Sequence, residues 1–167
     1  MQVDRSLLGR VSGRKVVTIE RGPVSVFAQA VKDTSPLYRD RRAATAAGFA
    51  DVPVPPTFPF AMGFWGSFEE LQEGLEPVEG NPLFEVMAGL GPGLILHGEQ
   101  EFVYHRPLVV GDVLYGEDVL SDVYEKTTDT HVMTFVVTTT EWSERSSGEP
   151  VLTMRFNLIH RSRRKEP

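Results

Sequence analysis

Apolar and polar residues alternate regularly in the second half of the chain. The clearest case is the segment 151–160, where every second residue is apolar: Leu152, Met154, Phe156 and Leu158. A period of two is typical of a strand with one buried face. Runs rich in β-branched and aromatic residues predict three more strands at 94–105, 112–124 and 130–142. Because the turns between these runs are short, we expect the strands to be antiparallel neighbours.

The first half of the chain combines short elements of different kinds. Its pattern predicts a strand at 15–20, an amphipathic helix at 22–31 and a short helix at 41–47 that Asp40 can cap. Residues 73–93 contain five glycines and three prolines, which together predict a long surface loop.

The most apolar stretch, 55–71, lies between these two halves. One row of aromatic and aliphatic residues follows helical spacing: Phe60, Phe64, Phe68 and Leu71. A second row makes the first two turns apolar on most sides: Phe58, Ala61 and Trp65. Thr57 is a candidate N-cap residue, and Pro59 is tolerated in a first turn. We therefore predict a buried helix about 22–25 Å long, with the sheet wrapped around it.

Composition fits a single domain with its own core. The 167 residues are 41% hydrophobic and 24% charged, as in ordinary globular proteins. The chain has no run of about 18 apolar residues, so we expect no membrane partner. Its net charge of −6 disfavours a nucleic-acid partner. The absence of cysteine excludes disulfides and thiolate ligands, and the spacing of the histidines predicts no metal site. We expect a cytoplasmic protein without a cofactor.

Two sets of motifs resemble a known family. The segment Lys32-Asp33-Thr34-Ser35-Pro36-Leu37-Tyr38 is similar to the loop Gly-Asp-x-Asn-Pro-aliphatic-His of MaoC-like hydratases and dehydratases. The segments 55–58 and 96–112 resemble the FAS1-like N-terminal dehydratase subgroup. The resemblance covers about residues 10–160. It implies an α+β fold, in which one hot-dog domain (1–167) wraps an antiparallel sheet around a long central helix and 161–167 is a basic tail.

The resemblance also implies a reaction and a partner. In the family, the Asp and the His of the loop act on either side of an acyl thioester, which implies catalytic positions at Asp33 and Tyr38. A phenol, with an ordinary pKa of about 10, is a poor base at neutral pH, whereas imidazole titrates at about 6.5. Subunits of this subgroup without the His are typically non-catalytic halves. The implied partners are an acyl thioester of coenzyme A or acyl carrier protein, and a catalytic hot-dog subunit in a heterodimer or heterotetramer; a homodimer is the alternative.

The family holds the thioester oxygen at the N-terminus of its central helix. The resemblance therefore implies substrate-binding positions at Pro56, Thr57 and Phe58. The backbone N–H groups of Thr57 and Phe58 would point out of that terminus, where the helix dipole favours developing negative charge. A capped helix end without a ligand is the alternative interpretation.

The remaining candidates have structural alternatives. His97 is a candidate groove residue or an edge histidine, and strand alternation places it on one face with Glu99 and Glu101. Asp33 is also a good Asx-turn former, and Tyr38 is also typical of a packed aromatic residue.

We interpret the chain as a subunit of a 2-enoyl/3-hydroxyacyl-thioester hydratase or dehydratase that binds the acyl chain and has Tyr38 in place of the catalytic His. Two alternatives stay open: an acyl-thioester-binding module without catalysis, and a complete homo-oligomeric hydratase that uses Asp33. A hot-dog thioesterase is less favoured, because Glu69 and Glu70 come too late in the predicted helix to supply its carboxylate.

Overall fold

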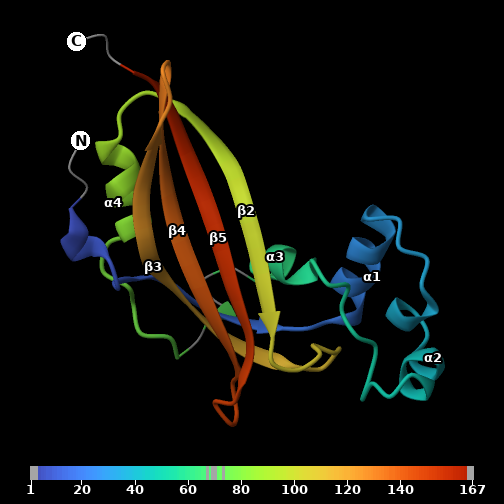
Figure 1. Ribbon diagram of the computed structural model, residues 1–167. Coiled ribbons are helices and arrows are strands. Elements are labelled where there is room, and N and C mark those ends of the chain that lie inside the picture. Colours follow the sequence, from blue (N-terminus) through green and yellow to red (C-terminus); the bar gives the residue numbers. More distant parts are fainter. Residues whose placement is uncertain (1–3, 67, 69–70, 73, 165–167) are drawn as a thin grey trace.

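The computed structural model describes residues 4–66, 68, 71–72 and 74–164. Within them, a five-stranded antiparallel sheet in the order β1-β3-β4-β5-β2 forms the body of the molecule (Figure 1). Its strands are β1 Val11–Thr18, β2 Leu94–Tyr104, β3 Val113–Thr127, β4 His131–Glu144 and β5 Pro150–Arg163. The five predicted strands and their antiparallel arrangement are confirmed, with bounds shifted by a few residues.

The helices gather at the two ends of this sheet (Figure 1). Beyond one end lie α1 Arg21–Ala30, the 3-10 turn η2 Pro36–Tyr38 and α2 Arg41–Ala46. Toward the other end, α4 Pro82–Gly89 packs against β1 and β4, near the first 3-10 turn, η1 Arg5–Leu7. The predicted helices at 22–31 and 41–47 are confirmed as α1 and α2. Asp40 caps α2, because its carboxylate accepts a hydrogen bond from the Arg42 N–H at 2.8 Å.

The predicted long central helix is wrong. Among the described residues of 55–71, the α-helix is limited to Phe58–Met62 (α3), and the chain then turns through Gly66, whose φ of +68° lies in the left-handed region. Gly63 is the C-cap of α3, and Gly66 adopts the left-handed conformation without steric cost, so the chain does not continue as a helix. Thr57 holds the N-cap position, but its side chain makes no capping hydrogen bond.

The aromatic rows of this segment divide differently from the prediction. Phe58 is 1% exposed and stacks on Trp65 with ring centroids 5.2 Å apart, whereas Phe64 is 70% exposed. Phe68 and Leu71 are also exposed. The row spaced at i, i+4, i+8 is therefore the outer row of the chain, and the row that contains Phe58 is the buried one. Glu69 and Glu70, whose late position in the predicted helix disfavoured a thioesterase, lie outside the described residues.

Part of the predicted surface loop at 73–93 is the helix α4, which corrects that prediction. Asn81 begins the helix, since its side-chain oxygen accepts hydrogen bonds from the N–H groups of Leu83 (3.0 Å) and Phe84 (3.2 Å). Pro82 occupies the first turn, where its missing N–H costs nothing. Val86 is buried against the sheet in a small cluster with Leu7, Leu120 and Val136.

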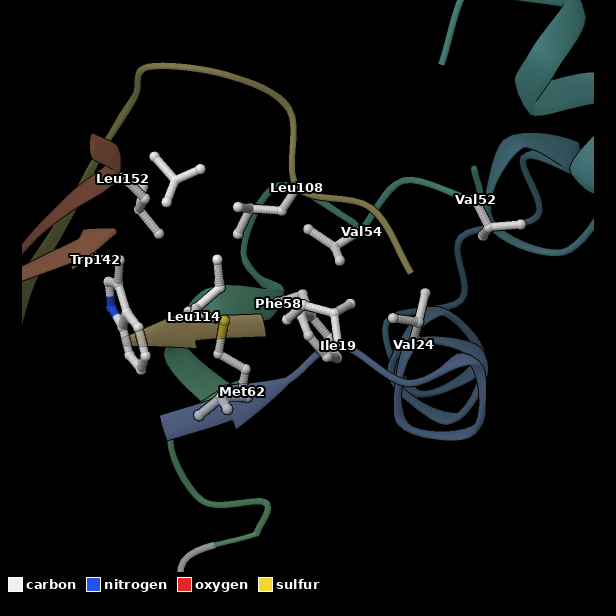
Figure 2. Close-up of a cluster of buried hydrophobic side chains, with 12 residues drawn as sticks. Ile19, Val24, Val52, Val54, Phe58, Met62, Leu108, Leu114, Trp142 and Leu152 are labelled. Atoms are coloured by element: carbon white, nitrogen blue, oxygen red, sulfur yellow. The ribbon is translucent and has the colours of Figure 1, made fainter. Parts of the chain in front are cut away.

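The larger core lies where α1, α3 and one end of the sheet meet (Figure 2). Figure 2 shows Phe58 and Met62 of α3 directed toward Ile19 and Leu114, with Trp142 beside them. The buried members are Val17, Ile19, Val24, Val52, Val54, Phe58, Met62, Leu108, Leu114, Trp142, Val151 and Leu152. Three segments distant in sequence, 19–24, 52–62 and 108–114, are thus brought to one end of the sheet.

Two substitutions test which aromatic residues of α3 support this core. Phe58→Ala should lower the free energy of unfolding by about 3–5 kcal/mol, because it opens a cavity in a packed region. Phe64→Ala, at a ring that is 70% exposed, should cost less than about 1 kcal/mol. Urea unfolding of both variants in dilute solution measures the difference. Equal losses of stability would contradict the assignment of buried and exposed rows.

Candidate functional site

A cavity of about 440 Å³ lies at the helical end of the sheet. Its lining comes from η2, from the extended segment before α3 and from the chain that leaves β2: Leu37, Tyr38, Phe49, Pro53, Val54, Pro56, Tyr104, His105, Arg106, Pro107 and Leu108. The Tyr104 hydroxyl donates a hydrogen bond to the Pro56 carbonyl at 2.8 Å and so ties β2 to the start of α3.

The floor of this cavity is held by backbone pairing. The Val54 N–H donates to the Leu108 carbonyl at 3.0 Å, and the Val110 N–H donates to the Val52 carbonyl at 2.9 Å. Arg106 anchors the turn that follows β2, because its guanidinium donates to Asp112 at 2.7 Å and to Glu144 at 2.8 Å. The Arg106 guanidinium is therefore used in two internal ion pairs, which stabilise the turn beside the cavity.

Asp33 makes a local hydrogen bond. Its carboxylate accepts from the Ser35 N–H at 2.9 Å, and the Ser35 hydroxyl in turn accepts from the Leu37 N–H at 3.3 Å. This is the geometry of an Asx turn that starts η2. The residue is exposed to solvent beside Tyr38.

Tyr38 lines the cavity as a half-buried phenol. Burial raises the pKa of its hydroxyl above the ordinary value, and the charge of Asp33 raises the pKa further. The same causes act on Tyr104, where burial raises the pKa well above its usual range and Tyr38 adds to the effect. Both phenols therefore keep their protons at neutral pH and offer O–H donors rather than bases.

The three residues predicted at the helix N-terminus lie in different surroundings. Pro56 lines the cavity, and Thr57 is exposed at the N-cap position. The Phe58 N–H donates to the Pro55 carbonyl at 2.9 Å, and its ring is in the core. The helix α3 has only five residues, and the Phe58 N–H is already used within the chain. Phe58 therefore offers no free donor to an oxyanion, and an oxyanion site at this terminus stays a prediction.

His97 lies apart from the first cavity, on the inner face of the sheet. Its ring contacts Phe60 and Phe156, with centroids 5.1 Å and 4.7 Å away. Tyr38 and Pro56 thus share one cavity, and the structure does not bring His97 to it.

A β-bulge corrects the prediction that His97, Glu99 and Glu101 share a face. The register of β2 against β5 shifts between His97 and Gln100. Glu99 accepts a hydrogen bond from Asn157 at 3.1 Å, on the face opposite to Phe156. Gly98 is required at this point, since a Cβ atom there would lie 2.8 Å from Ile159 and 3.0 Å from the Asn157 carbonyl.

Sequence reasoning missed Tyr104 as a site residue and gave His105 no role. The His105 Nε2 lies 3.0 Å from the Thr153 hydroxyl, which donates to Glu141 at 2.7 Å. Because that hydroxyl proton goes to Glu141, Thr153 accepts from the histidine Nε2–H, and Nδ1 is left without a hydrogen-bond partner among the described residues. The only signal in the sequence was two polar aromatic residues at the end of a strand, just before Arg106-Pro107.

Metal-binding clusters and membrane-spanning helices are both absent from the described part of the chain. No group of three or more His, Asp or Glu side chains there is arranged to hold a metal ion. No helix in it has the length and apolar character needed to cross a membrane.

The family model described as "FAS1-like, dehydratase domain region" matches residues 6–154. The chain belongs to this family. A relative from Saccharopolyspora erythraea, a UPF0336 protein, is 32% identical to this FAS1-like chain over 169 residues, with 100% of the chain and 97% of the relative covered. A UPF0336 protein of Streptomyces avermitilis is 36% identical over 115 residues, or 68% of the chain and 69% of that relative.

Solved structures show the fold of this FAS1-like chain. The ChsH1–ChsH2 complex from Mycobacterium tuberculosis matches with a TM-score of 0.70 at 22% identity, covering 94% of this chain and 87% of that one. A C-terminally truncated HadBC (3R-hydroxyacyl-ACP dehydratase) complex from the same organism matches with a TM-score of 0.67 at 22% identity, covering 92% and 96%. The predicted hot-dog fold, α+β with one antiparallel sheet, is confirmed.

Alkaline pH tests the protonated phenols of this FAS1-like site. The Tyr104 pKa is raised in the folded state, so stability is intact below about pH 10 and is lost as pH rises through the folded-state pKa. The melting temperature of the wild type should therefore fall more steeply above about pH 10 than that of Tyr104→Phe. The difference at pH 8 gives the cost of the lost hydrogen bond to Pro56. Parallel declines of the two proteins would contradict a raised pKa at Tyr104.

Proposed function

We propose that this chain is the acyl-binding subunit of a 2-enoyl/3-hydroxyacyl-thioester hydratase or dehydratase in the cytoplasm. In this proposal, a second hot-dog subunit supplies the proton-transfer pair. The observation that carries the proposal is Tyr38: a half-buried phenol with a raised pKa stands at the family's base position. The thioester is that of coenzyme A or of an acyl carrier protein.

Hydration of an enoyl thioester needs a group that accepts and returns a proton near neutral pH. Tyr38 stays protonated there, and Asp33 is an exposed carboxylate that already accepts the Ser35 N–H. General acid–base groups each contribute about 10²–10⁴-fold. Without an imidazole at position 38, this pair supports little turnover by itself.

The same hydroxyl groups suit a binding role. Tyr38 faces the 440 Å³ cavity as a donor, and the Tyr104 hydroxyl already holds Pro56 at its rim. Most of the remaining lining is apolar, from Leu37, Phe49 and Val54. An apolar cavity with one free O–H donor is suited to an acyl group and one oxygen atom of its thioester.

The partner is proposed to add its own sheet to the edge strand β2. Among the described strands, only β5 pairs with β2, so its other edge presents unpaired backbone groups. The strand also exposes apolar side chains, Leu94, Ile95, Leu96, Val103 and Tyr104. Two of the similar solved structures are complexes of two named hot-dog chains, which supports pairing with a sibling of the same fold.

Assembly is tested at that edge. The purified chain should form a dimer, or a dimer of dimers, at micromolar concentration, because pairing covers the exposed edge. Leu96→Lys should shift the population toward monomer by at least tenfold in dissociation constant, as measured by light scattering. Phe84→Lys, at an exposed ring on α4, is the matched control and should leave assembly unchanged. A wild-type monomer at these concentrations would overturn self-pairing at this edge.

One observation favours a second candidate function, a complete hydratase that works as a homo-oligomer. His105 lines the same cavity as Tyr38. Its Nε2–H donates to the Thr153 hydroxyl, which in turn donates to Glu141. An imidazole fixed in this way presents Nδ1 as a possible base, with Asp33 as the second group. In this candidate the missing histidine of the loop is replaced from the end of β2.

Turnover of crotonyl and dodecenoyl thioesters separates the two candidates. The purified chain alone should hydrate both at a negligible rate, and activity should appear with a hot-dog subunit that carries an intact Gly-Asp-x-Asn-Pro-aliphatic-His loop. In that complex, Asp33→Ala and His105→Gln should each lower turnover less than tenfold, because the partner's pair does the chemistry. A rate of order 10 s⁻¹ from the chain alone, abolished by His105→Gln or Asp33→Ala, would establish the complete enzyme instead. Thioester binding without turnover in any such complex would leave the binding module.

A further inference from the structure

A second cavity, of about 400 Å³, lies at the end of the sheet where β2 begins and β5 ends, opposite to α1 and α2 (Figure 1). Its lining comes from the chain before β2 and from the ends of β2, β4 and β5: Pro92, Gly93, Leu94, His131, Arg161, Ser162 and Arg163. His131 of β4 pairs with Arg163 of β5. On the other side of β5, Leu94 of β2 pairs with Arg161. The segment 161–163 is therefore the end of a paired strand rather than a free tail.

This cavity is positively charged. Arg161 and Arg163 are exposed, and neither has a carboxylate partner among the described residues. The Arg161 Nη2 lies 3.2 Å from Nε2 and 3.4 Å from Nδ1 of His131, whose Nδ1 also lies 2.7 Å from the Thr130 hydroxyl. In a chain with a net charge of −6, this arginine cluster (Arg161, Arg163 and His131) is a local exception. The planar fork of N–H donors on a guanidinium matches the oxygens of a phosphate group.

The arginines of α2 form a less favourable anion site. Arg41 and Arg42 line a wider recess, which Asp40 shares with them, and Arg41 lies 3.2 Å from Asp51. These carboxylates offset the positive charge of the recess. Although α2 packs on η2 beside the first cavity, charge favours the arginine cluster on β5 as the place for a phosphate group.

The arginine cluster is distant from the first cavity of its own chain. Leu94 and Tyr104 are the two ends of the 11-residue strand β2, about 33 Å apart at the usual rise per residue. Only Tyr104 lines the first cavity. A ligand held there therefore has the arginine cluster of the same chain at the far end of the sheet.

Pairing of two copies at the β2 edge removes this separation. All strand pairs of the described sheet are antiparallel. Two β2 strands that pair in the same way over their full length place Leu94 of one copy beside Tyr104 of the other. Because β5 is the next strand, the partner's Arg161 would then lie about two strand spacings, or about 10 Å, from this Tyr104.

We propose that the arginine cluster of one subunit binds the phosphate group of a thioester whose acyl end lies in the first cavity of the paired subunit. The inference rests on the proposed function, since it assumes that the first cavity holds the thioester and that subunits pair at β2. The ligand chemistry is a phosphate ester, which coenzyme A and the phosphopantetheine arm of an acyl carrier protein share. Arg161 and Arg163 donate hydrogen bonds to the phosphate oxygens.

This arrangement gives the chain a part in its partner's reaction. Each thioester site is incomplete within one chain, because the cavity and the arginine cluster that serve one ligand come from different subunits. A subunit with Tyr38 in place of the histidine would still hold the carrier arm of the thioester on which the partner's proton-transfer pair acts.

Calorimetric titration of the full chain with three saturated thioesters tests the phosphate site. The probes are S-decanoyl-pantetheine, S-decanoyl-4′-phosphopantetheine and decanoyl-coenzyme A. At least one phosphate-bearing probe should bind at least about tenfold more tightly than the first, because charge-assisted hydrogen bonds are the strong ones. An equal gain from both assigns the cluster to the phosphate that the two carriers share, and a gain with decanoyl-coenzyme A alone assigns it to the nucleotide phosphates.

The double variant Arg161→Gln/Arg163→Gln should remove this phosphate advantage and leave the affinity for S-decanoyl-pantetheine unchanged. Arg41→Gln/Arg42→Gln removes the same charge at the recess on α2 and is the matched control, which should keep the full advantage. Equal affinity of the three probes for the wild type, or an advantage that survives Arg161→Gln/Arg163→Gln, would overturn the phosphate site and leave the proposed function intact.

Mixed dimers test whether the cluster acts across the pair. Leu37→Trp fills the first cavity and keeps the arginines, whereas Arg161→Gln/Arg163→Gln keeps the cavity. Neither variant alone should bind decanoyl-coenzyme A tightly. Mixed dimers, isolated through a different affinity tag on each variant, should regain the wild-type affinity at one cavity per dimer.

The remaining outcomes decide different levels of the proposal. A wild type that stays monomeric, or mixed dimers without tight binding, would overturn this inference and leave the thioester cavity in place. Absence of binding by all three probes, or thioester binding that is unchanged in Leu37→Trp, would overturn the proposed function, and this inference with it.

Discussion

The rest of this structure depends on the packing of the buried Phe58 ring between Phe27 and Trp65. Its ring meets Phe27 of α1 edge-on at 5.5 Å and stacks on Trp65 at 5.2 Å, with 1% of its surface exposed. This contact fixes α3 and α1 against the end of the sheet. The candidate site adjoins that junction through Pro56. A single buried aromatic residue thus holds together the elements that line the candidate site.

The strands could be predicted from the sequence because each repeats one simple pattern. In β5, alternation alone identifies Leu152 and Leu158 as inward-facing, and the structure places both in hydrophobic clusters. The α3 prediction failed because a periodic row does not say which of its neighbours is buried. Phe60, Phe64 and Phe68 have helical spacing, yet Gly63 and Gly66 follow the first turn and the chain leaves the helix. The Asn81-Pro82 start of α4 was present in the sequence, but the surrounding glycines and prolines concealed it.

The candidate site was predictable only as far as local motifs reach. The segment around Asp33 and Tyr38 was found because its residues are contiguous and resemble a family loop. Tyr104 and His105 come from about 66 residues further along the chain, and only the fold places them in the cavity with Tyr38. The raised pKa of Tyr38 is likewise a product of burial and of the nearby Asp33 charge, so no residue pattern contains it. The pairing register of β2 could not be read from the sequence either. One extra residue near Gly98 places Glu99 on the face opposite to His97.

The bulge in β2 interrupts the regular backbone pattern of this edge strand. Backbone groups of a regular edge accept any extended chain, and this is the route to non-specific aggregation. Here the register changes between His97 and Gln100, and Gly98 cannot be replaced without contact with Ile159 and the Asn157 carbonyl. A second sheet therefore has to match two short ladders offset by the bulge rather than one continuous one. If the proposed partner adds its sheet at this edge, the offset favours a chain with the complementary interruption over other chains of the same fold.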